Sequence, residues 1–360
     1  MDAIQKNLLE QVADLHEIPT GAYNIRTNGG LAGRNTTANI DIITKEDKPG
    51  IDIIIKPGTK KESLHIPVLL TQSGIKESVY NDFIIGEDCD VTIIAGCGIH
   101  NGGKEGSEHS GIHSFVVGKN SKVKYVEKHY GSGEGTGERV MNPTTIIELK
   151  EGAYLEMDTV QIKGVDSTKR TTKATLGDNA TLVIKEKIMT HGKQTEVNLD
   201  GENSGANVIS RSVAKDDSYQ LFLSKINGNN KCHGHTECDA IIMDDAHVSA
   251  LPQITANHID AALIHEAAIG KIAGEQLIKL MTLGLTEEEA DELLKADKAI
   301  DKREKMPFDL TKEQQEIAKS FTKTGTKTKK APTVYKFEKK KTENVPKAEL
   351  IKKLEELLNN

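Results

Sequence analysis

Apolar and polar residues alternate in short runs from about residue 39 to residue 256. Typical runs are Ile40-Asp-Ile-Ile, Val91-Thr-Ile-Ile and Leu182-Val-Ile, each bounded by Gly, Asn or Asp. A period of two places alternate side chains on opposite faces of a strand, and Gly, Asn and Asp favour tight turns. The pattern therefore predicts a central region of short β-strands joined by turns.

This unit of turn and strand repeats along the chain. A small residue follows a polar turn and precedes a strand at six places, namely Cys89, Ser121, Ala153, Ala180, Ser218 and Ala246. The intervals between them are 32, 32, 27, 38 and 28 residues. The repeat favours a solenoid of stacked β-coils with loop insertions over a large antiparallel sandwich, which would also contain short strands.

Helical patterns flank the β region. Apolar residues recur at helical spacing in residues 2–16, and again over residues 258–283 before Gly284. Residues 286–289 have the form of a capping box that opens a further helix. The expected organisation is an N-terminal helix and linker (1–38), a β-helix core (39–256), a C-terminal helical segment (257–296) and a basic tail with a short terminal helix (297–360).

Composition narrows the class of protein. The 360 residues include no Trp and six Phe, so the core must be packed largely with aliphatic side chains, which suit stacked β layers. The formal charge of −7 argues against a general nucleic-acid binder, although it averages −13 for residues 1–295 and +6 for residues 296–360. No apolar run is long enough for a membrane span and no signal peptide is recognisable. We therefore expect a soluble, cytoplasmic protein whose four cysteines are reduced.

The densest set of metal-ligand residue types is Cys232-His-Gly-His-Thr-Glu-Cys238-Asp. Thiolate and imidazole are suitable ligands for zinc or iron. In a regular strand, however, Cys232 and Cys238 would share one face while His233 and His235 would lie on the other. A single ion could bind all four side chains only if the strand were bent or if ligands came from elsewhere.

A second set comprises His100, His109, His113 and His129, near Cys97 in a Gly-rich stretch. Glycine lets a loop approach a ligand closely, so these histidines are candidates for binding a metal or for tuning the thiol. A surface loop with incidental histidines would have the same pattern. The sequence contains no phosphate loop, zinc-protease motif or serine-hydrolase motif.

The most specific motifs lie in the C-terminal half: Glu237-Cys-Asp, His265-Glu-Ala and Gly270-Lys-Ile-x-x-Glu-Gln-Leu. Together with GCGI and VKYVEKH further upstream, they resemble the SufB/SufD family of iron–sulfur cluster assembly scaffolds, over roughly residues 60–295. The resemblance implies a mainly β fold, a right-handed parallel β-helix with flanking helical segments, which agrees with the repeat. It also implies a scaffold and not an enzyme, with ATP hydrolysis by a SufC-type ABC ATPase that docks on the C-terminal helical region.

The same resemblance assigns roles to individual residues. Cys97 matches the cysteine that accepts persulfide sulfur, and Cys238, His265 and Glu266 match proposed ligands of the nascent cluster. Cys232 is a further candidate ligand, and a thiol near His and Lys is more readily ionised. The cluster type, the sulfur donor and the apo-protein acceptors stay open. A flavin is a possibility raised by the wider family and has no support in this sequence.

Some features depart from the family pattern. Ile264 stands where SufB has an acidic residue, and the basic tail has no counterpart. Cys97, Cys238 and Glu266 resemble SufB, whereas the Gly-Lys after the His motif resembles SufD. One chain with both signatures predicts a homodimer in place of the SufB–SufD heterodimer, in which Cys238 of one chain could face His265 of the other.

Other functions are compatible with parts of the sequence. A structural zinc-binding β-solenoid would use the cluster between Cys232 and Cys238. A β-helix acyltransferase would explain the hexapeptide-like runs after Ile85 and Leu176, but these are not consecutive. A polysaccharide-active β-helix would be secreted and would carry aromatic platforms, which this sequence lacks. Cys89 occupies the small, inward repeat position and is interpreted as a core thiol.

Overall fold

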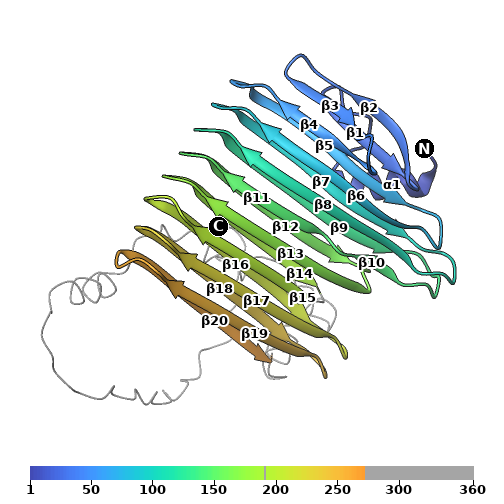
Figure 1. Cartoon of the computed structure of the whole chain (residues 1–360). Helices are drawn as coiled ribbons and strands as arrows, with labels where there is room; N and C mark the ends of the chain where they lie inside the picture. The colour runs from blue at the N-terminus through green and yellow to red at the C-terminus, as the bar shows by residue number, and fades with distance from the viewer. Residues whose placement is uncertain (190–191, 272–360) are drawn as a thin grey trace, which may run out of the picture. The chain divides into compact units, whose positions relative to one another are not determined.

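The structure, a computed structural model, describes residues 1–189 and 192–271 (Figure 1). It contains one helix and twenty strands among these residues. In chain order they are α1 (Ala3–Ala13), β1 (Ala22–Thr27), β2 (Gly30–Asn35), β3 (Ile40–Thr44), β4 (Gly50–Ile55), β5 (Lys60–Leu70), β6 (Lys76–Ile85), β7 (Asp90–His100), β8 (Ser107–Val117), β9 (Lys122–Ser132), β10 (Arg139–Met141), β11 (Thr144–Leu149), β12 (Tyr154–Lys163), β13 (Ser167–Leu176), β14 (Thr181–Met189), β15 (Gly192–Leu199), β16 (Ser204–Ala214), β17 (Tyr219–Gly228), β18 (Cys232–Ile242), β19 (His247–Ala256) and β20 (Ala261–Lys271).

The strands form a parallel β-solenoid with two sheets. The first sheet has the order β2-β1-β5-β7-β9-β12-β14-β16-β18-β20, and the second runs from β3 and β4 through β6, β8, β10 with β11, β13, β15 and β17 to β19. From β4 and β5 onward, paired residues in neighbouring coils are 23 to 33 positions apart, as Lys169 with Gly192 and Asp90 with Lys122. Within the described residues only β1–β2 and β3–β4 pair antiparallel. The predicted solenoid is confirmed, and the antiparallel sandwich is excluded.

The corners of the coils explain the sequence repeat. Four of its small residues directly precede strands of the first sheet, but Ser218 and Ala246 precede strands of the second sheet. The interval of 38 residues from Ala180 to Ser218 therefore compares two different corners. The matching corner is at Ser204, which is fully buried and follows Asn203 in a left-handed conformation (φ 56°). The sequence repeat missed this coil because its strand opens with Gly-Ala-Asn, which weakens the apolar alternation.

The N-terminal helix is confirmed as α1. Asp2 caps it, because the Asp2 carboxylate accepts a hydrogen bond from the Gln5 amide at 2.8 Å while the Gln5 side chain accepts one from the Asp2 amide. The buried Leu8 and Val12 pack on the outer face of the first sheet. A Cβ at Gly96 would lie 2.4 Å from the Val12 carbonyl oxygen, so the glycine is needed for the helix to approach β7 this closely.

The helix expected from residue 258 is wrong where the structure describes it. Residues 261–271 form strand β20, which pairs in parallel with β18 over its whole length. The apolar residues of this segment also fit a period of two, and the backbone hydrogen bonds offered by β18 favour the strand. The rest of that helix, the capping box at 286–289 and the basic tail lie outside the described residues.

Candidate functional site

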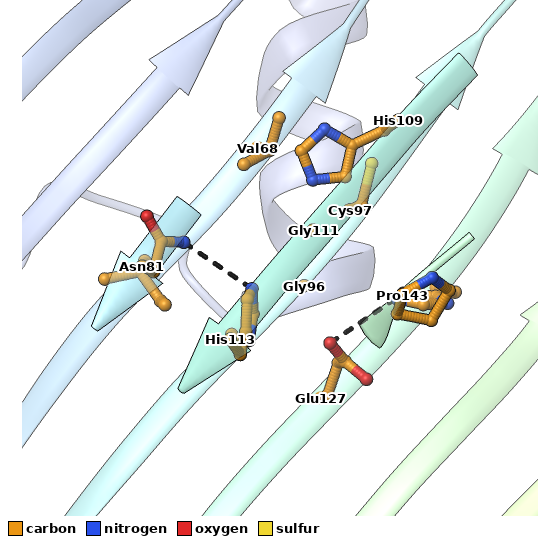
Figure 2. A pocket seen from close by; sticks show the side chains of 12 residues that line it. Val68, Asn81, Gly96, Cys97, His109, Gly111, His113, Glu127 and Pro143 are labelled. Atoms are coloured by element: carbon orange, nitrogen blue, oxygen red, sulfur yellow. Dashed lines mark hydrogen bonds and ion pairs between the residues drawn. The ribbon is translucent and has the colours of Figure 1, made fainter. Parts of the chain in front are cut away.

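Cys97 lies inside the solenoid near the middle of β7. It is 2% exposed and packs with Val68, Ile99 and Met141. The flanking Gly96 and Gly98 face α1 on the outer side of the sheet, so alternation directs the thiol inward. Figure 2 shows the small cavity beside it, about 20 Å³ in volume, which is room for about one water molecule.

Three of the four candidate histidines line this cavity. His109 and His113 come from β8 and His129 from β9, and all three are buried. The expected Gly-rich loop is therefore wrong for them, since they stand on strands and alternation turns them inward. His100, by contrast, is half-buried and hydrogen-bonds Ser132 at 3.1 Å between Nδ1 and Oγ.

A hydrogen-bonded chain runs through the interior from His113. The Tyr125 hydroxyl donates to Glu127 at 3.0 Å, so the Nδ1–H of His113 donates to the Tyr125 oxygen at 2.8 Å. The amide of Asn81 lies 3.5 Å from His113 Nε2 (Figure 2). Burial, which outweighs the nearby Glu127 charge, lowers the pKa of His113 to about 4, so this imidazole is neutral at physiological pH.

This buried imidazole predicts a loss of stability in mild acid. An unfolded histidine titrates near 6.5, so the stabilisation is fully present above that pH and is lost as the pH falls towards 4. A shift of this size corresponds to about 3 kcal/mol of unfolding free energy. Urea denaturation at pH 7 and pH 4.5 measures it. His113→Gln should flatten the dependence while the exposed His16→Gln leaves it unchanged, and equal stability of the wild type at both pH values would contradict the prediction.

Charged residues continue this polar interior towards the C-terminal coils. The Nη1 atom of Arg170 donates a hydrogen bond to Glu127 at 2.6 Å. The Nε atom of Arg170 lies 3.9 Å from a carboxylate oxygen of Glu186. Lys193 pairs with the other side of Glu186. We call Glu127, His129, Arg170, Glu186 and Lys193 the polar row. Although burial opposes ionisation, the charge of Arg170 helps to hold the pKa of Glu127 well below its usual range.

The sequence identified His129 as a candidate but not the other four members of the polar row. The strand alternation offers a signal for two members of this row. Glu127 and His129 occupy alternate positions that continue the inward-facing series of Val123 and Tyr125. A charged residue that faces the interior of the solenoid needs a partner of opposite charge there, and the partner of Glu127 is Arg170.

Cys238 lies further along the interior, on β18. It is 5% exposed and packs with Ile188 and Phe222. Burial raises the pKa of its thiol to about 11, against the opposing charge of Lys193. Burial likewise raises the pKa of Cys97 well above the usual value, with further contributions from Glu77 and Glu127. The expectation that neighbouring His and Lys ionise these thiols is therefore wrong in this conformation.

The register of β18 and β20 decides which candidate ligands meet. Thr236 pairs with His265 and Cys238 pairs with Ala267, so the Cys238 and His265 side chains share the inner face with an offset of two residues. Burial lowers the pKa of His265, and its Nδ1 is a buried atom without a hydrogen-bond partner. Glu266 is exposed on the outer face. The structure thus places Cys238 and His265 on the same face of adjacent strands and places Glu266 on the other face.

The remaining cysteines are placed at corners of the coils. Cys232 is buried at the start of β18, six positions before Cys238, which is about 20 Å along a strand. His233 and His235 lie on the opposite face, so the zinc site expected as one alternative is not assembled by this strand. Cys89 is 1% exposed at its corner, as expected of a core thiol, and its Sγ donates to the Lys56 carbonyl at 3.2 Å.

The buried, protonated thiols predict slow chemical modification. Thiolate is the nucleophile, and both burial and a raised pKa suppress it at Cys97 and Cys238. We expect iodoacetamide at pH 7.5 to label these two cysteines at least tenfold more slowly in the native chain than in denaturant, as read by peptide mass spectrometry. Rapid native labelling of Cys97 would contradict the described packing.

The fold and the interior define a class of protein: a parallel β-solenoid that encloses thiols, imidazoles and charged side chains. Comparison with known protein families identifies the family to which this class of structure belongs. The family model for the SUF system FeS cluster assembly SufBD core domain matches residues 75–297. This is more than half of the chain, and the chain belongs to the SufBD family.

Individual relatives agree with this assignment. An iron–sulfur cluster assembly SufBD family protein of Methanocaldococcus jannaschii is 30% identical over 253 residues, which are 67% of this chain and 78% of the relative. One from Archaeoglobus fulgidus is 33% identical over 68% of this chain and 66% of its own length. One from Pyrococcus horikoshii is 30% identical over 73% of this chain and 82% of its own. A role in iron–sulfur cluster assembly follows from membership of this family.

No helix within residues 1–189 and 192–271 is long and apolar enough to cross a membrane.

Proposed function

We propose that this chain is a scaffold on which nascent iron–sulfur clusters are assembled. Cys97 accepts sulfur, and Cys238 with His265 binds the cluster. The observation that carries the proposal is the shared inner face of Cys238 and His265 on paired strands. A thiolate and an imidazole are ligands that iron accepts, and a mixed set of this kind releases a cluster more readily than four thiolates would.

The polar row supports a connection between the two thiols. Glu127 lies close enough to Cys97 to raise the pKa of its thiol, and Lys193 lies close enough to Cys238 to oppose the rise in the pKa of that thiol. Arg170 and Glu186 link these two groups through ion pairs. The interior between the proposed sulfur acceptor and the proposed cluster site is therefore charged, whereas an ordinary solenoid core would be aliphatic throughout.

The burial of both thiols supports the proposal that a partner protein acts on this chain. Sulfur transfer and cluster ligation both require thiolate, and the described conformation stabilises the protonated forms. We propose that a SufC-type ABC ATPase binds this chain and drives the opening that exposes them. A homodimer would supply two copies of the cluster site to each assembly.

Anaerobic co-purification with such an ATPase, followed by iron and sulfide analysis, tests the proposal. We expect iron and acid-labile sulfide in comparable amounts, and a stable complex of the two proteins. Zinc without sulfide would support a structural metal-binding protein instead. The acyltransferase alternative gains no support from coils of 23 to 33 residues, because hexapeptide folds repeat every six residues.

A further inference from the structure

Three metal-ligand side chains converge on the outer face of β18 and β20. They are His235, Glu237 and Glu266, and their ligand atoms all lie within 4.8 Å of one another. Glu237 pairs directly with Glu266 across the two strands, and His235 precedes Glu237 by two positions on the same face. The Nε2 atom of His235 lies 3.7 Å from Oε2 of Glu266.

The neighbouring strand β16 orients two of these side chains. The Nδ1 atom of His235 is 3.0 Å from the Oδ1 atom of Asn207, which can only accept a hydrogen bond, so Nδ1 carries the proton and Nε2 directs its lone pair towards Glu266. Arg211 donates from Nη2 to Glu237 at 3.3 Å. Such contacts fix the tautomer and the orientation of metal ligands before an ion binds.

The electrostatics of this face favour a cation. Two carboxylates directly opposite each other on paired strands repel. Arg211 carries one positive charge that is shared between two carboxylates, with Nη2 3.3 Å from Glu237 and Nε 3.9 Å from Asp239. The side chains of His235 and Glu237 are only 14% and 13% exposed, which limits the screening by water.

We propose that His235, Glu237 and Glu266 form a binding site for a divalent first-row metal ion, which is iron(II) in the working scaffold. One imidazole and two carboxylates suit iron(II), and three protein ligands leave positions open for water or sulfide. The site lies on the opposite face of the strands that carry Cys238 and His265. This inference rests on the proposed function, because it makes the outer face the place where iron is loaded beside the cluster site.

Iron(II) binding without sulfide tests the site. The full chain is titrated anaerobically with iron(II), and bound metal is measured by equilibrium dialysis. We expect one tight iron(II) per chain, with affinity reduced on the order of tenfold or more in His235→Ala and Glu237→Gln, and also in Asn207→Ala through lost orientation. His233→Ala is the matched control, since His233 lies on the same strand and face two positions earlier, and it should bind as the wild type does.

Other variants separate this inference from the proposed function. Cys238→Ser and His265→Ala should retain the iron(II) site while losing reconstituted cluster. Wild-type affinity in His235→Ala, or loss of the ion in Cys238→Ser instead, would overturn the outer site but leave the scaffold proposal standing. Absence of stoichiometric binding to the wild type would show that the three side chains hold no metal ion and would overturn the site. Circular dichroism confirms that each variant is folded.

Discussion

Replacement of Cys238 by serine is expected to abolish the cluster that iron(II) and sulfide reconstitute on this chain. A serine hydroxyl stays protonated where a thiol can ionise, so it cannot supply the sulfur ligand on the inner face of β18. The visible absorbance of the reconstituted protein should fall to background, and acid-labile sulfide should fall with it. His265→Ala should lower both, because its imidazole is the partner on the adjacent strand.

Cys89→Ser is the matched control. The next coil already has a serine at the equivalent corner, where the Ser121 hydroxyl donates to the Gly86 carbonyl at 2.7 Å. The control should therefore fold and reconstitute normally. Because a buried hydroxyl at position 238 can itself destabilise the chain, Cys238→Ala is measured beside it, with thermal unfolding of both. If Cys238→Ser and His265→Ala both keep full absorbance, the proposed cluster site is wrong.

The sequence predicted the solenoid because the repeat is a local signal. Each corner that precedes β7, β9, β12, β14 or β16 has a small buried residue, and the residue before it takes a left-handed conformation, as Asn120 does (φ 55°) and Gly152 does (φ 66°). Strand alternation then fixed the faces of β18, so the separation of Cys232 and Cys238 from His233 and His235 could be derived without a structure.

The candidate site was less accessible to sequence reasoning, for two reasons. The segment around His265 fits both helical and strand periods, and only pairing with β18 selects the strand and sends His265 and Glu266 to opposite faces. The partners inside the solenoid are also far apart in sequence, as Glu127 and Arg170 are. Charge pairing across 43 positions has no local signature.

Removal of Arg170 is expected to give the largest loss of stability. Arg170 is 6% exposed, and its guanidinium compensates Glu127 and Glu186, which are 4% and 2% exposed. Breaking a buried pair by removing one partner leaves an unpaired charge and typically costs about 3–5 kcal/mol. Arg170→Met should lower the urea unfolding free energy by about that amount at pH 7. Lys119→Ala is the control, because Lys119 pairs with Glu151 at the exposed surface and its loss should have no measurable effect.

The pH dependence of this loss distinguishes charge from packing. In the wild type the depressed pKa of Glu127 contributes stability above the ordinary carboxyl value of 4.5, and this contribution is lost as pH falls through the depressed value. Without Arg170, burial raises the pKa of Glu127, so the carboxyl takes up its proton at a higher pH than in the wild type. The difference between Arg170→Met and the wild type should therefore shrink between pH 7 and pH 4. Arg170→Met combined with Glu127→Gln should recover part of the loss at pH 7, and a deficit that is independent of pH would mean that Arg170 acts through its packing rather than its charge.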